Sequence, residues 1–470
     1  MKQTDTDICV IGAGSGGLSV AAGAVQMGAR VVLIEGGRMG GDCLNYGCVP
    51  SKALLAAAKQ AHVMRSGGAG IAGIEPAVDY AKAMAHVSDT IAHIAPVDSQ
   101  QRFEELGCTV LRDYASFVSG QEVQASDTIV KARRFVIATG SSPLVPPIDG
   151  LDGVPYLTNE TLFDLREAPS HLLILGGGPI GMEMAQAHQR LGCDVTVIEG
   201  DTAMNREDPE AVAVVLDALR REGVSVAEGA MAERVSGDAN AVTVHTKDGR
   251  AFDGTHLLVA LGRRPNIGQL NLEAAGVDTS SQGITVGDDL RTTNRRIYAI
   301  GDVAGRGQFT HLAGYHASTI IRPMLFGLPA KAKQAHIPRA TYTDPELAQV
   351  GMTESEARAA HGDIEIARFA TDENDRAIAT GKTAGFIKVV VHKGRPVGAT
   401  IVGADAGELI ALWSLALSKN LKMSDVAGMV AAYPTRAELG KRAAGAYFSP
   451  RLFERTTVKR IVGAVQRVLP

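Results

Sequence analysis

The chain has few cysteines, few aromatic residues and no long apolar run. Its 470 residues include five cysteines and one tryptophan, and aromatic residues make up 4% of the total. Five scattered cysteines are too few for a disulfide scaffold, and their odd number argues against a purely structural set. No apolar run reaches the ~18 residues of a membrane span, and residues 1–6 lack the pattern of a signal or transit peptide. We therefore expect a globular protein of the cytoplasm or another reducing compartment.

An excess of charge of one sign is also lacking. The chain carries 47 Lys and Arg against 51 Asp and Glu, a formal net charge of -4. Such a balance predicts no general attraction to nucleic acid or to anionic membrane surfaces, so any anionic ligand must be held locally. Hydrophobic residues make up 45% of the chain, which is enough for a large core, and the usual ~150 residues per domain suggest about three domains.

What the sequence does contain is an internal repeat of a strand, a Gly-rich turn, a helix and a second strand. The first copy runs from Thr4 to Glu35 and the second from His171 to Glu199. The first strand of each copy is a continuous apolar run, which is typical of a parallel sheet covered on both faces. Two such units predict two sites of dinucleotide size.

Both copies carry glycines in G-x-G-x-x-G spacing followed by an acidic residue. These residues are Gly12, Gly14, Gly17 and Glu35 in the first copy, and Gly176, Gly178, Gly181 and Glu199 in the second. The glycines permit a tight turn, close approach to a pyrophosphate and close packing of helix on strand, while the carboxylate accepts hydrogen bonds from ribose hydroxyls. A carboxylate at Glu199 repels a 2'-phosphate and favours NAD(H) over NADP(H). Arg206, seven residues on, is interpreted as a solvated loop residue.

Cys43 and Cys48 differ from the other cysteines because they lie in a Gly-rich polar stretch that opens a helix. Residues five apart on an ideal helix are separated by ~7.5 Å along its axis, more than the about 4.4–6.8 Å between the Cα atoms of a disulfide. A bridge therefore needs an unwound first turn, which Gly47 and Pro50 permit. A helix N-terminus also lowers the pKa of a thiol. A metal clip and two unpaired thiols are the alternatives, but no second Cys or His cluster lies nearby, so we predict a redox pair and no metal site.

The other three cysteines have a simpler interpretation as small packing residues in or beside strands. They are Cys9, Cys108 and Cys193.

The stretch "GGDCLNYGCVPSK" (residues 40–52) resembles the redox motif of the class I pyridine nucleotide-disulfide oxidoreductases, the group of dihydrolipoamide dehydrogenase, glutathione reductase and mercuric reductase. Further matching motifs are "ATG" at 138–140, "GGGPIGMEMA", "ALGRRPN" at 260–266, "AIGDVAG" at 299–305 and "YTDPELAQVG" at 342–351. The resemblance covers essentially the whole chain. It implies an α/β fold with two Rossmann-like dinucleotide-binding domains, for FAD and NAD, and a C-terminal α+β dimerisation domain. The implied boundaries are 1–147 and 266–335 for FAD, 148–265 for NAD(P), and 336–470 for dimerisation in a homodimer.

The resemblance also implies roles for single residues. Cys48 would be the thiolate beside the flavin, and Cys43 the interchange thiol that attacks the substrate. Lys52 would approach the flavin N5 region and pair with Glu183, because a buried Lys and a buried Glu tolerate desolvation only as a pair. The remaining implied contacts are Thr139, Gly140, Asp302 and Thr310 for FAD, with Asp302 on its ribityl chain, and Gly262 for NAD.

One position departs from the family pattern. Dithiol-handling members carry a His-Pro-Thr-x-x-Glu motif whose His comes from the partner subunit and moves the substrate's proton, whereas this chain has Tyr433 in that place and Glu438 at its end. A phenol of pKa ~10 is a poor base at neutral pH. Tyr433 resembles mercuric reductases, which also carry a C-terminal cysteine pair, whereas the last cysteine here is Cys193.

Three functions follow from these residues. The first is a dihydrolipoamide dehydrogenase-like exchange of electrons between NAD(H), FAD, the cysteine pair and a lipoyl-type or other small dithiol or disulfide. The second is a mercuric reductase-like enzyme, or a reductase of quinones or other acceptors. The third is a flavoprotein subunit that binds a partner through a basic tail.

That tail is the last feature of the sequence. Its basic residues are Lys441, Arg442, Arg451, Arg455, Lys459, Arg460 and Arg467, against the single acidic Glu454. From about Thr457 its valines and isoleucine follow a helical period. We expect this helix to pack on its own dimerisation domain with a solvated basic face; an acidic partner or a membrane surface is the alternative.

Overall fold

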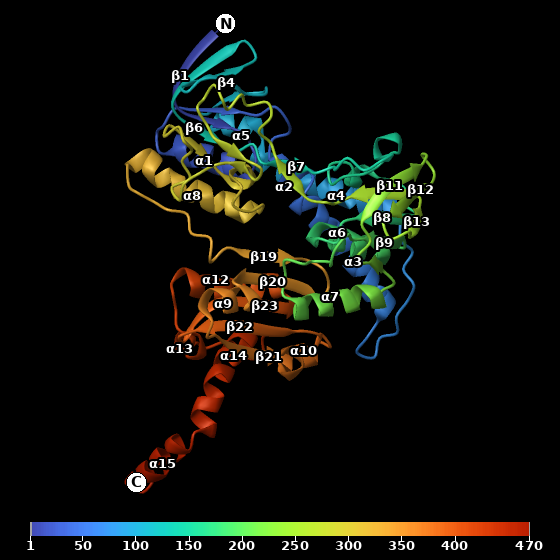
Figure 1. Ribbon diagram of the computed structural model, residues 1–470, viewed down its shortest axis with the longest axis vertical. Helices are drawn as coiled ribbons and strands as arrows, with labels where there is room; N and C mark the ends of the chain where they lie inside the picture. Colours follow the sequence, from blue (N-terminus) through green and yellow to red (C-terminus); the bar gives the residue numbers. More distant parts are fainter. Residues whose placement is uncertain (1, 470) are drawn as a thin grey trace. The chain divides into compact units, whose positions relative to one another are not determined.

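The computed structural model describes residues 2–469, which divide into two compact units. Unit 1 comprises Met1–Asp201 and Val224–Ala332, and unit 2 comprises Thr202–Gly223 and Lys333–Pro470. Figure 1 follows the chain through both units. The three-domain boundaries inferred from the sequence stay a prediction.

Unit 1 is built around a seven-stranded sheet. Its strands are β1 (Lys2–Ile11), β2 (Val31–Ile34), β3 (Thr109–Leu111), β4 (Ser116–Ser119), β5 (Glu122–Ala125), β6 (Thr128–Ile137) and β18 (Ile297–Ala299). They lie in the order β3-β2-β1-β6-β5-β4, and β18 also pairs with β6. β1 runs parallel to β2 and β6, and its second half, residues 8–11, is buried, as is typical of a parallel sheet covered on both faces. Helices α1 (Ser15–Gln26) and α8 (Thr310–Phe326) lie side by side (Figure 1) and contribute to the same apolar core.

A second, four-stranded sheet carries the repeat. It consists of β8 (His171–Leu175), β9 (Asp194–Ile198), β10 (Ser225–Ala227) and β14 (His256–Val259), in the order β10-β9-β8-β14. All three pairings are parallel, and α6 (Pro179–Arg190) follows β8. The predicted strand-glycine-helix-strand repeat is therefore confirmed as a structural repeat. A three-stranded antiparallel sheet is attached, with β11 (Ala232–Gly237), β12 (Val242–Thr246) and β13 (Ala251–Gly254).

The rest of unit 1 consists of helices and short connecting elements. The helices are α2 (Gly41–Asn45), α3 (Cys48–Ser66), α4 (Tyr80–Ile94), η1 (Ala95–Asp98), α5 (Gln100–Glu105), η2 (Leu151–Gly153), η3 (Leu162–Asp164) and η4 (Gly301–Ala304). The short strands are β7 (Ser141–Pro143), β15 (Arg263–Pro265), β16 (Thr279–Ser280) and β17 (Gly283–Ile284). Cys9, Cys108 and Cys193 are buried, as expected of packing residues.

Unit 2 contains an antiparallel sheet of five strands in the order β19-β20-β23-β22-β21. The strands are β19 (Pro338–Thr341), β20 (Glu346–Gly351), β21 (Glu365–Ala370), β22 (Phe386–His392) and β23 (Arg395–Gly403). Its helices are α7 (Pro209–Arg221), α9 (Glu354–His361), η5 (Thr371–Glu373), α10 (Asp375–Ala379), α11 (Ala406–Leu409), α12 (Ala411–Ser418), α13 (Met423–Ala427), α14 (Glu438–Ser449), η6 (Pro450–Glu454) and α15 (Thr456–Val465). One face packs on α12, α13 and α14 around the fully buried Trp413. The predicted separate α+β region is confirmed.

A buried lysine lies on the other face of this sheet. Lys388, in β22, is only 3% exposed, and its Nζ lies 2.7 Å from the carboxylate of Asp208 and 2.6 Å from that of Glu210. Glu354 is a third partner at 3.4 Å. Asp208 caps α7 and Glu210 lies in its first turn, so this cluster ties residues 202–223 to the sheet.

The prediction that the last helix packs on its own domain is wrong. No residue of α15 is buried, and Figure 1 shows α15 extending away from the five-stranded sheet of its own unit. The apolar period was read correctly, but a period shows only that one side of a helix is apolar and not what covers that side. None of the helices among residues 2–469 is both long enough and apolar enough to cross a membrane.

Candidate active site

The first glycine turn has the geometry that a dinucleotide needs. A Cβ on Gly17 would lie 1.9 Å from the Gly12 carbonyl oxygen, and Gly12 itself has a φ of +105°, so larger residues are excluded at both positions. Gly14 is the N-cap of α1 and makes no side-chain capping bond, which leaves the first N–H groups of the helix for phosphate oxygens. These features fit the pyrophosphate of FAD.

Glu35, which directly follows β2, forms hydrogen bonds at the same glycine turn. Its carboxylate accepts hydrogen bonds from the backbone N–H groups of Ala13 (2.5 Å) and Gly37 (2.6 Å). The side chain is therefore fixed beside the glycine turn, where the hydroxyls of a ribose would be expected.

The second glycine turn repeats this geometry. A Cβ on Gly181 would lie 2.1 Å from the Gly176 carbonyl oxygen, and Gly178 is the uncapped N-cap of α6. Glu199 accepts hydrogen bonds from the N–H groups of Gly177 (2.6 Å) and Asp201 (2.9 Å). This geometry fits a second dinucleotide, and the Glu199 carboxylate is fixed beside the glycine turn.

The cysteine pair lies across a helix break. α2 ends at Asn45, and α3 begins at Cys48 after Gly47, whose φ of −123° and ψ of −109° are not helical. The chain is thus unwound between the two cysteines, where Gly47 had predicted it. Both cysteines are free thiols in this structure, with Cys48 exposed and Cys43 partly buried.

The two thiols differ in acidity because one stabilises the other. The hydrogen bond from Cys43 lowers the pKa of Cys48 to about 6, and the Thr310 hydroxyl and the charge of Lys52 act in the same direction against burial and Asp42. The Cys48 Sγ lies 3.2 Å from the Thr310 Oγ1. The same hydrogen bond and burial raise the pKa of Cys43. At neutral pH the pair therefore holds a thiolate at Cys48 and a protonated thiol at Cys43.

Lys52 and Glu183 come from different helices and form an ion pair. The Lys52 Nζ lies 2.7 Å from the Glu183 Oε2 and 3.3 Å from the Ser51 hydroxyl. Lys52 lies one turn after Cys48 in α3, whereas Glu183 is buried in α6. The ion pair thus links α3, which begins at Cys48, to α6, which follows the second glycine turn. A cation at this point would stabilise a reduced, anionic flavin.

A polar network beside the thiols was missed by sequence reasoning. Arg263 lies 2.9 Å from the carboxylate of Asp42 and donates to the Ser141 hydroxyl and carbonyl, each at 2.7 Å. The Ser141 hydroxyl in turn donates to Asp302 at 2.5 Å, and burial raises the pKa of Asp302. Asp42 precedes Cys43 within the redox motif and Arg263 lies in "ALGRRPN", which was the only available signal.

The remaining predicted cofactor residues lie at the connections between the two sheets of unit 1. The Thr139 hydroxyl donates to the Asn266 carbonyl at 2.7 Å, and the Asn266 N–H donates to the Gly140 carbonyl at 3.0 Å. Gly262 precedes β15, which pairs with β7. The structure therefore brings Thr139 and Gly140 together with the start of the 266–335 segment.

Tyr433 and Glu438 lie in unit 2, and Glu438 is partly buried. Tyr433 is 70% exposed, and its hydroxyl donates to the Asp375 carboxylate at 3.0 Å. That hydrogen bond and the charge of Asp375 raise the pKa of Tyr433 above its ordinary value. Glu438 opens α14. Asp375 was not predicted, because nothing in its local sequence marks it as a partner of Tyr433.

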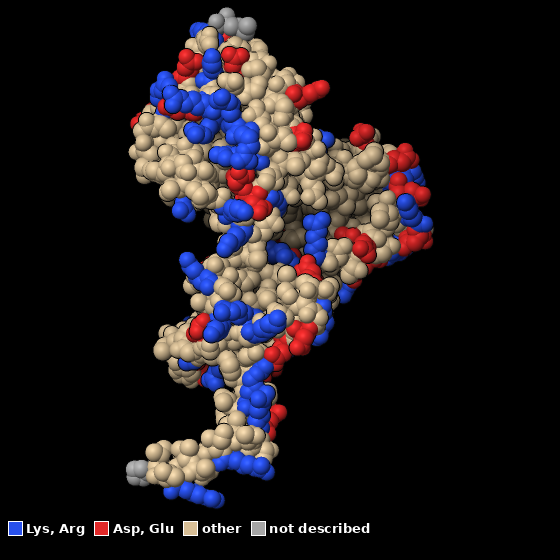
Figure 2. Space-filling model, turned by 60° about the vertical axis from the view of Figure 1, so that its left-hand side comes forward, with Lys and Arg blue, Asp and Glu red and all other residues tan. Residues whose placement is uncertain are grey.

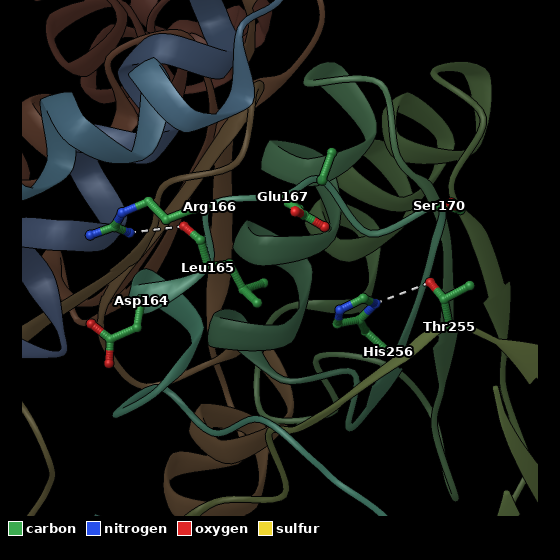
Figure 3. Close-up of a pocket in the computed structure, with 8 residues that line it drawn as sticks. Asp164, Leu165, Arg166, Glu167, Ser170, Thr255 and His256 are labelled. Carbon is green, nitrogen blue, oxygen red and sulfur yellow. Dashed lines mark hydrogen bonds between the residues drawn. The ribbon is translucent and has the colours of Figure 1, made fainter. Parts of the chain in front are cut away.

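A hollow of about 500 Å³ in unit 1 is unrelated to the dinucleotide sites. Figure 3 shows its lining, which includes residues 164–168, Ser170, Thr255 and His256. Ser170 precedes β8 and His256 opens β14, so the hollow lies at the amino ends of these parallel strands. Nucleotides bind at the carboxyl ends of such strands, where the glycine turns are.

Comparisons with protein families and with known sequences agree with the two glycine turns and the cysteine pair described above. A family model described as pyridine nucleotide-disulphide oxidoreductase matches residues 6–317, and one described as the dimerisation domain of that family matches residues 337–444. A mercuric reductase of Bacillus cereus is 35% identical over 92% of this chain and 70% of that protein. Dihydrolipoyl dehydrogenase of Bacillus subtilis strain 168 is 34% identical over 92% of this chain and 96% of that protein.

A solved structure agrees with these sequence matches. The HOCl-induced flavoprotein disulfide reductase RclA from Escherichia coli has a TM-score of 0.84 and 27% identity, covering 93% of this chain and 99% of that one. The family is FAD-dependent, uses a pyridine nucleotide and acts on a sulfur group, and its dimerisation model indicates a homodimer. This chain belongs to the pyridine nucleotide-disulphide oxidoreductase family of flavoprotein disulfide reductases.

Proposed function

We propose that the protein is an NADH-dependent flavoprotein reductase whose Cys43–Cys48 pair serves a thiophilic acceptor, with a soft metal ion as the first candidate. The observation that carries this proposal is the hydrogen bond from Tyr433 to Asp375. It keeps the phenol protonated at the position where dithiol-handling relatives use a histidine base.

The thiol pair is the electron store in this proposal. FAD, when bound, would carry two electrons from NADH, delivered as hydride, to a Cys43–Cys48 disulfide, which with the proton of the hydride becomes the Cys48 thiolate and the Cys43 thiol. Thr310 and Lys52 stabilise the charge on Cys48, and Cys43 faces the acceptor. Oxidation of the Cys48 thiolate and the Cys43 thiol to the disulfide returns two electrons, which reduce one divalent ion to the neutral atom or two cupric ions to cuprous ions, and releases the one proton that Cys43 held.

An acceptor of this kind does not require a base at Tyr433. A lipoyl-type disulfide must gain two protons during its reduction and lose them in the reverse direction, and a positioned acid or base contributes about 10²- to 10⁴-fold to such a step. A metal ion takes electrons without taking protons. A phenol with a raised pKa is therefore compatible with the metal acceptor and unfavourable for the lipoyl acceptor.

The relatives give independent support. The curated relatives include mercuric reductases of several bacteria, and one RclA structure is described as a Cu(II) complex. Glu199, held by two backbone N–H groups, favours NADH over NADPH. By the family resemblance, the protein would act as a homodimer, with Tyr433 and Glu438 completing the active site of the partner subunit.

A lipoyl-type disulfide is the second candidate, and the dihydrolipoyl dehydrogenase relative favours it. That enzyme is as similar to this chain as the mercuric reductases are, and the same Cys43–Cys48 pair would serve it. The two candidates differ in whether the acceptor needs an acid or base at position 433.

A panel of acceptors tests the proposal. The FAD-loaded protein would be reduced with NADH without oxygen and mixed with Hg(II), Cu(II), lipoamide, glutathione disulfide or a quinone. We expect rapid NADH oxidation with the metal ions and turnover with lipoamide about 10²-fold slower. Lipoamide turnover equal to or faster than metal reduction would overturn the assignment and establish the second candidate.

A further inference from the structure

The helix α15 exposes apolar side chains that the described residues of unit 2 leave largely open. Ile461 and Val462 are each more than half exposed, and Val468 is 84% exposed. Backbone N–H groups of Gln466 and Leu469 donate to the carbonyls of Val462 and Val465, so the helical path continues past the end of α15. Leu452 and Phe453, just before the helix, are exposed as well.

The helical period separates two kinds of side chain on this segment. At 100° per residue, the apolar residues fall within an arc of about 120°, while the basic residues lie on the opposite side. The apolar residues are Val458, Ile461, Val462, Val465, Val468 and Leu469. The basic residues opposite them are Lys459, Arg460 and Arg467. Figure 2 shows the blue side chains along one side of this last segment and tan surface along the other.

The charge of this segment is opposite to that of the chain. Residues 455–469 contain four basic residues and no acidic one, whereas the whole chain has a net charge of -4. The basic charge is therefore concentrated on an exposed helix, where an anionic surface can reach it.

We propose that residues 455–469 bind the surface of an anionic lipid bilayer, with the helix lying in the plane of the interface. A lipid surface satisfies both sides of the helix at once, since acyl chains cover the apolar side and phosphate headgroups meet the lysine and arginines. The segment is about 21 Å long at 1.5 Å per residue, too short for the ~30 Å hydrocarbon core, so it lies on the bilayer and does not cross it.

A second copy of this chain is a less complete partner for the helix. Pairing of two such helices would cover the apolar side, but the segment has no carboxylate to meet the basic side chains of the other copy. The basic residues would then face water on the outside of the pair. An anionic lipid surface uses both features of the helix.

Flotation of the FAD-loaded, full-length protein with lipid vesicles tests this proposal. One set of vesicles would contain phosphatidylcholine alone, and the other equal parts of phosphatidylcholine and phosphatidylglycerol. We expect binding to the mixed vesicles, weakened by salt, and little binding to the neutral ones. Neutralising three cations together (K459Q, R460Q and R467Q) should weaken binding by about 100-fold, since each contributes about fivefold near an anionic surface.

Two further variants complete the test. The pair I461Q and V465Q removes apolar contacts while keeping the charge, and we expect it to abolish flotation. The matched control exchanges two uncharged polar residues, T456Q with Q466T, and should bind like the parent protein. All these side chains are exposed, so thermal unfolding should be unchanged.

Several outcomes would overturn the proposal. These are failure of the parent protein to float with mixed vesicles, equal binding to neutral vesicles, or full binding by the triple glutamine variant. Conversion of a dimer into a monomer by I461Q and V465Q, seen by light scattering and without any vesicle binding, would assign the helix to a second copy instead. Enzyme activity is not needed for any of these measurements.

Discussion

The surroundings of the thiol pair and those of Tyr433 have opposite effects on ionisation. Around Cys48, a hydrogen bond from Cys43, the Thr310 hydroxyl and the Lys52 charge favour the ionised form. Around Tyr433, the Asp375 carboxylate favours the protonated form, and the side chain is largely exposed. In the proposed function, electrons are stored by a cysteine pair whose surroundings come from several segments of the chain, whereas proton transfer to the acceptor depends on position 433 alone. Acceptor choice is therefore expected to be easier to change than electron storage.

Removing the thiolate should have the largest effect. We expect C48S to lower acceptor-dependent NADH oxidation by about 10³-fold or more, because a serine hydroxyl neither ionises near pH 7 nor forms a disulfide. Flavin reduction by NADH, followed in a stopped-flow spectrometer, should persist. C108A, at a buried cysteine outside the site, is the matched control. Retention of more than a tenth of the activity by C48S would place electron transfer elsewhere.

Restoring a base at position 433 should change the acceptor. We expect Y433H to raise kcat/KM for lipoamide by about 10²-fold, because an imidazole next to the Asp375 carboxylate can take a proton near pH 7. The rate with a metal ion should stay within about twofold. Y433F keeps the ring without a titratable group and should gain no lipoamide activity. If Y433H also gains none, the acceptor is selected by something other than the missing base.

The acidity of Cys48 should appear directly in a pH profile. A thiol with a pKa of about 6 is ionised above that pH and protonated below it. Alkylation of the NADH-reduced protein by iodoacetamide should therefore rise about tenfold between pH 5 and pH 7 and then level off. T310V removes a hydrogen bond to the sulfur and should move the midpoint upward. A midpoint near that of an ordinary thiol would contradict the lowered pKa.

The smallest expected effect concerns the coenzyme. E199Q keeps the shape of the side chain and an oxygen acceptor but removes the charge, so kcat/KM for NADPH should rise about fivefold relative to NADH, the effect of one charge in a largely aqueous setting. Asp194, at the other end of β9, provides the control D194N. A parent protein that already prefers NADPH would show that Glu199 does not set the coenzyme.

Much of this site could be predicted because its constraints are local. Gly12 and Gly17 are required by backbone contacts within one turn, and the acidic residue after the second strand follows at a fixed spacing. The helix break at Gly47 follows from the distance between two cysteines five residues apart. These features depend on chain geometry over a few residues and are visible in a single sequence.

The features that were missed depend on tertiary contacts. Nothing near Arg263 in the sequence indicates that it will meet Asp42, and nothing near Lys388 indicates Asp208. Likewise, the apolar side of α15 was recognised, but its exposure could not be, since helical periodicity carries no information about partners.

The helix α7 belongs to unit 2 but comes from an earlier part of the chain than the rest of that unit, which limits how unit 2 can be exchanged with relatives. The backbone passes between the two units after Asp201, after Gly223 and after Ala332, so unit 2 is not one continuous stretch of gene. A fragment of residues 336–470 would carry Lys388 without Asp208 and Glu210, leaving a buried cation without two of its counter-ions. A chimera that exchanges this unit between relatives must therefore transplant residues 202–223 together with the later segment, as a matched pair.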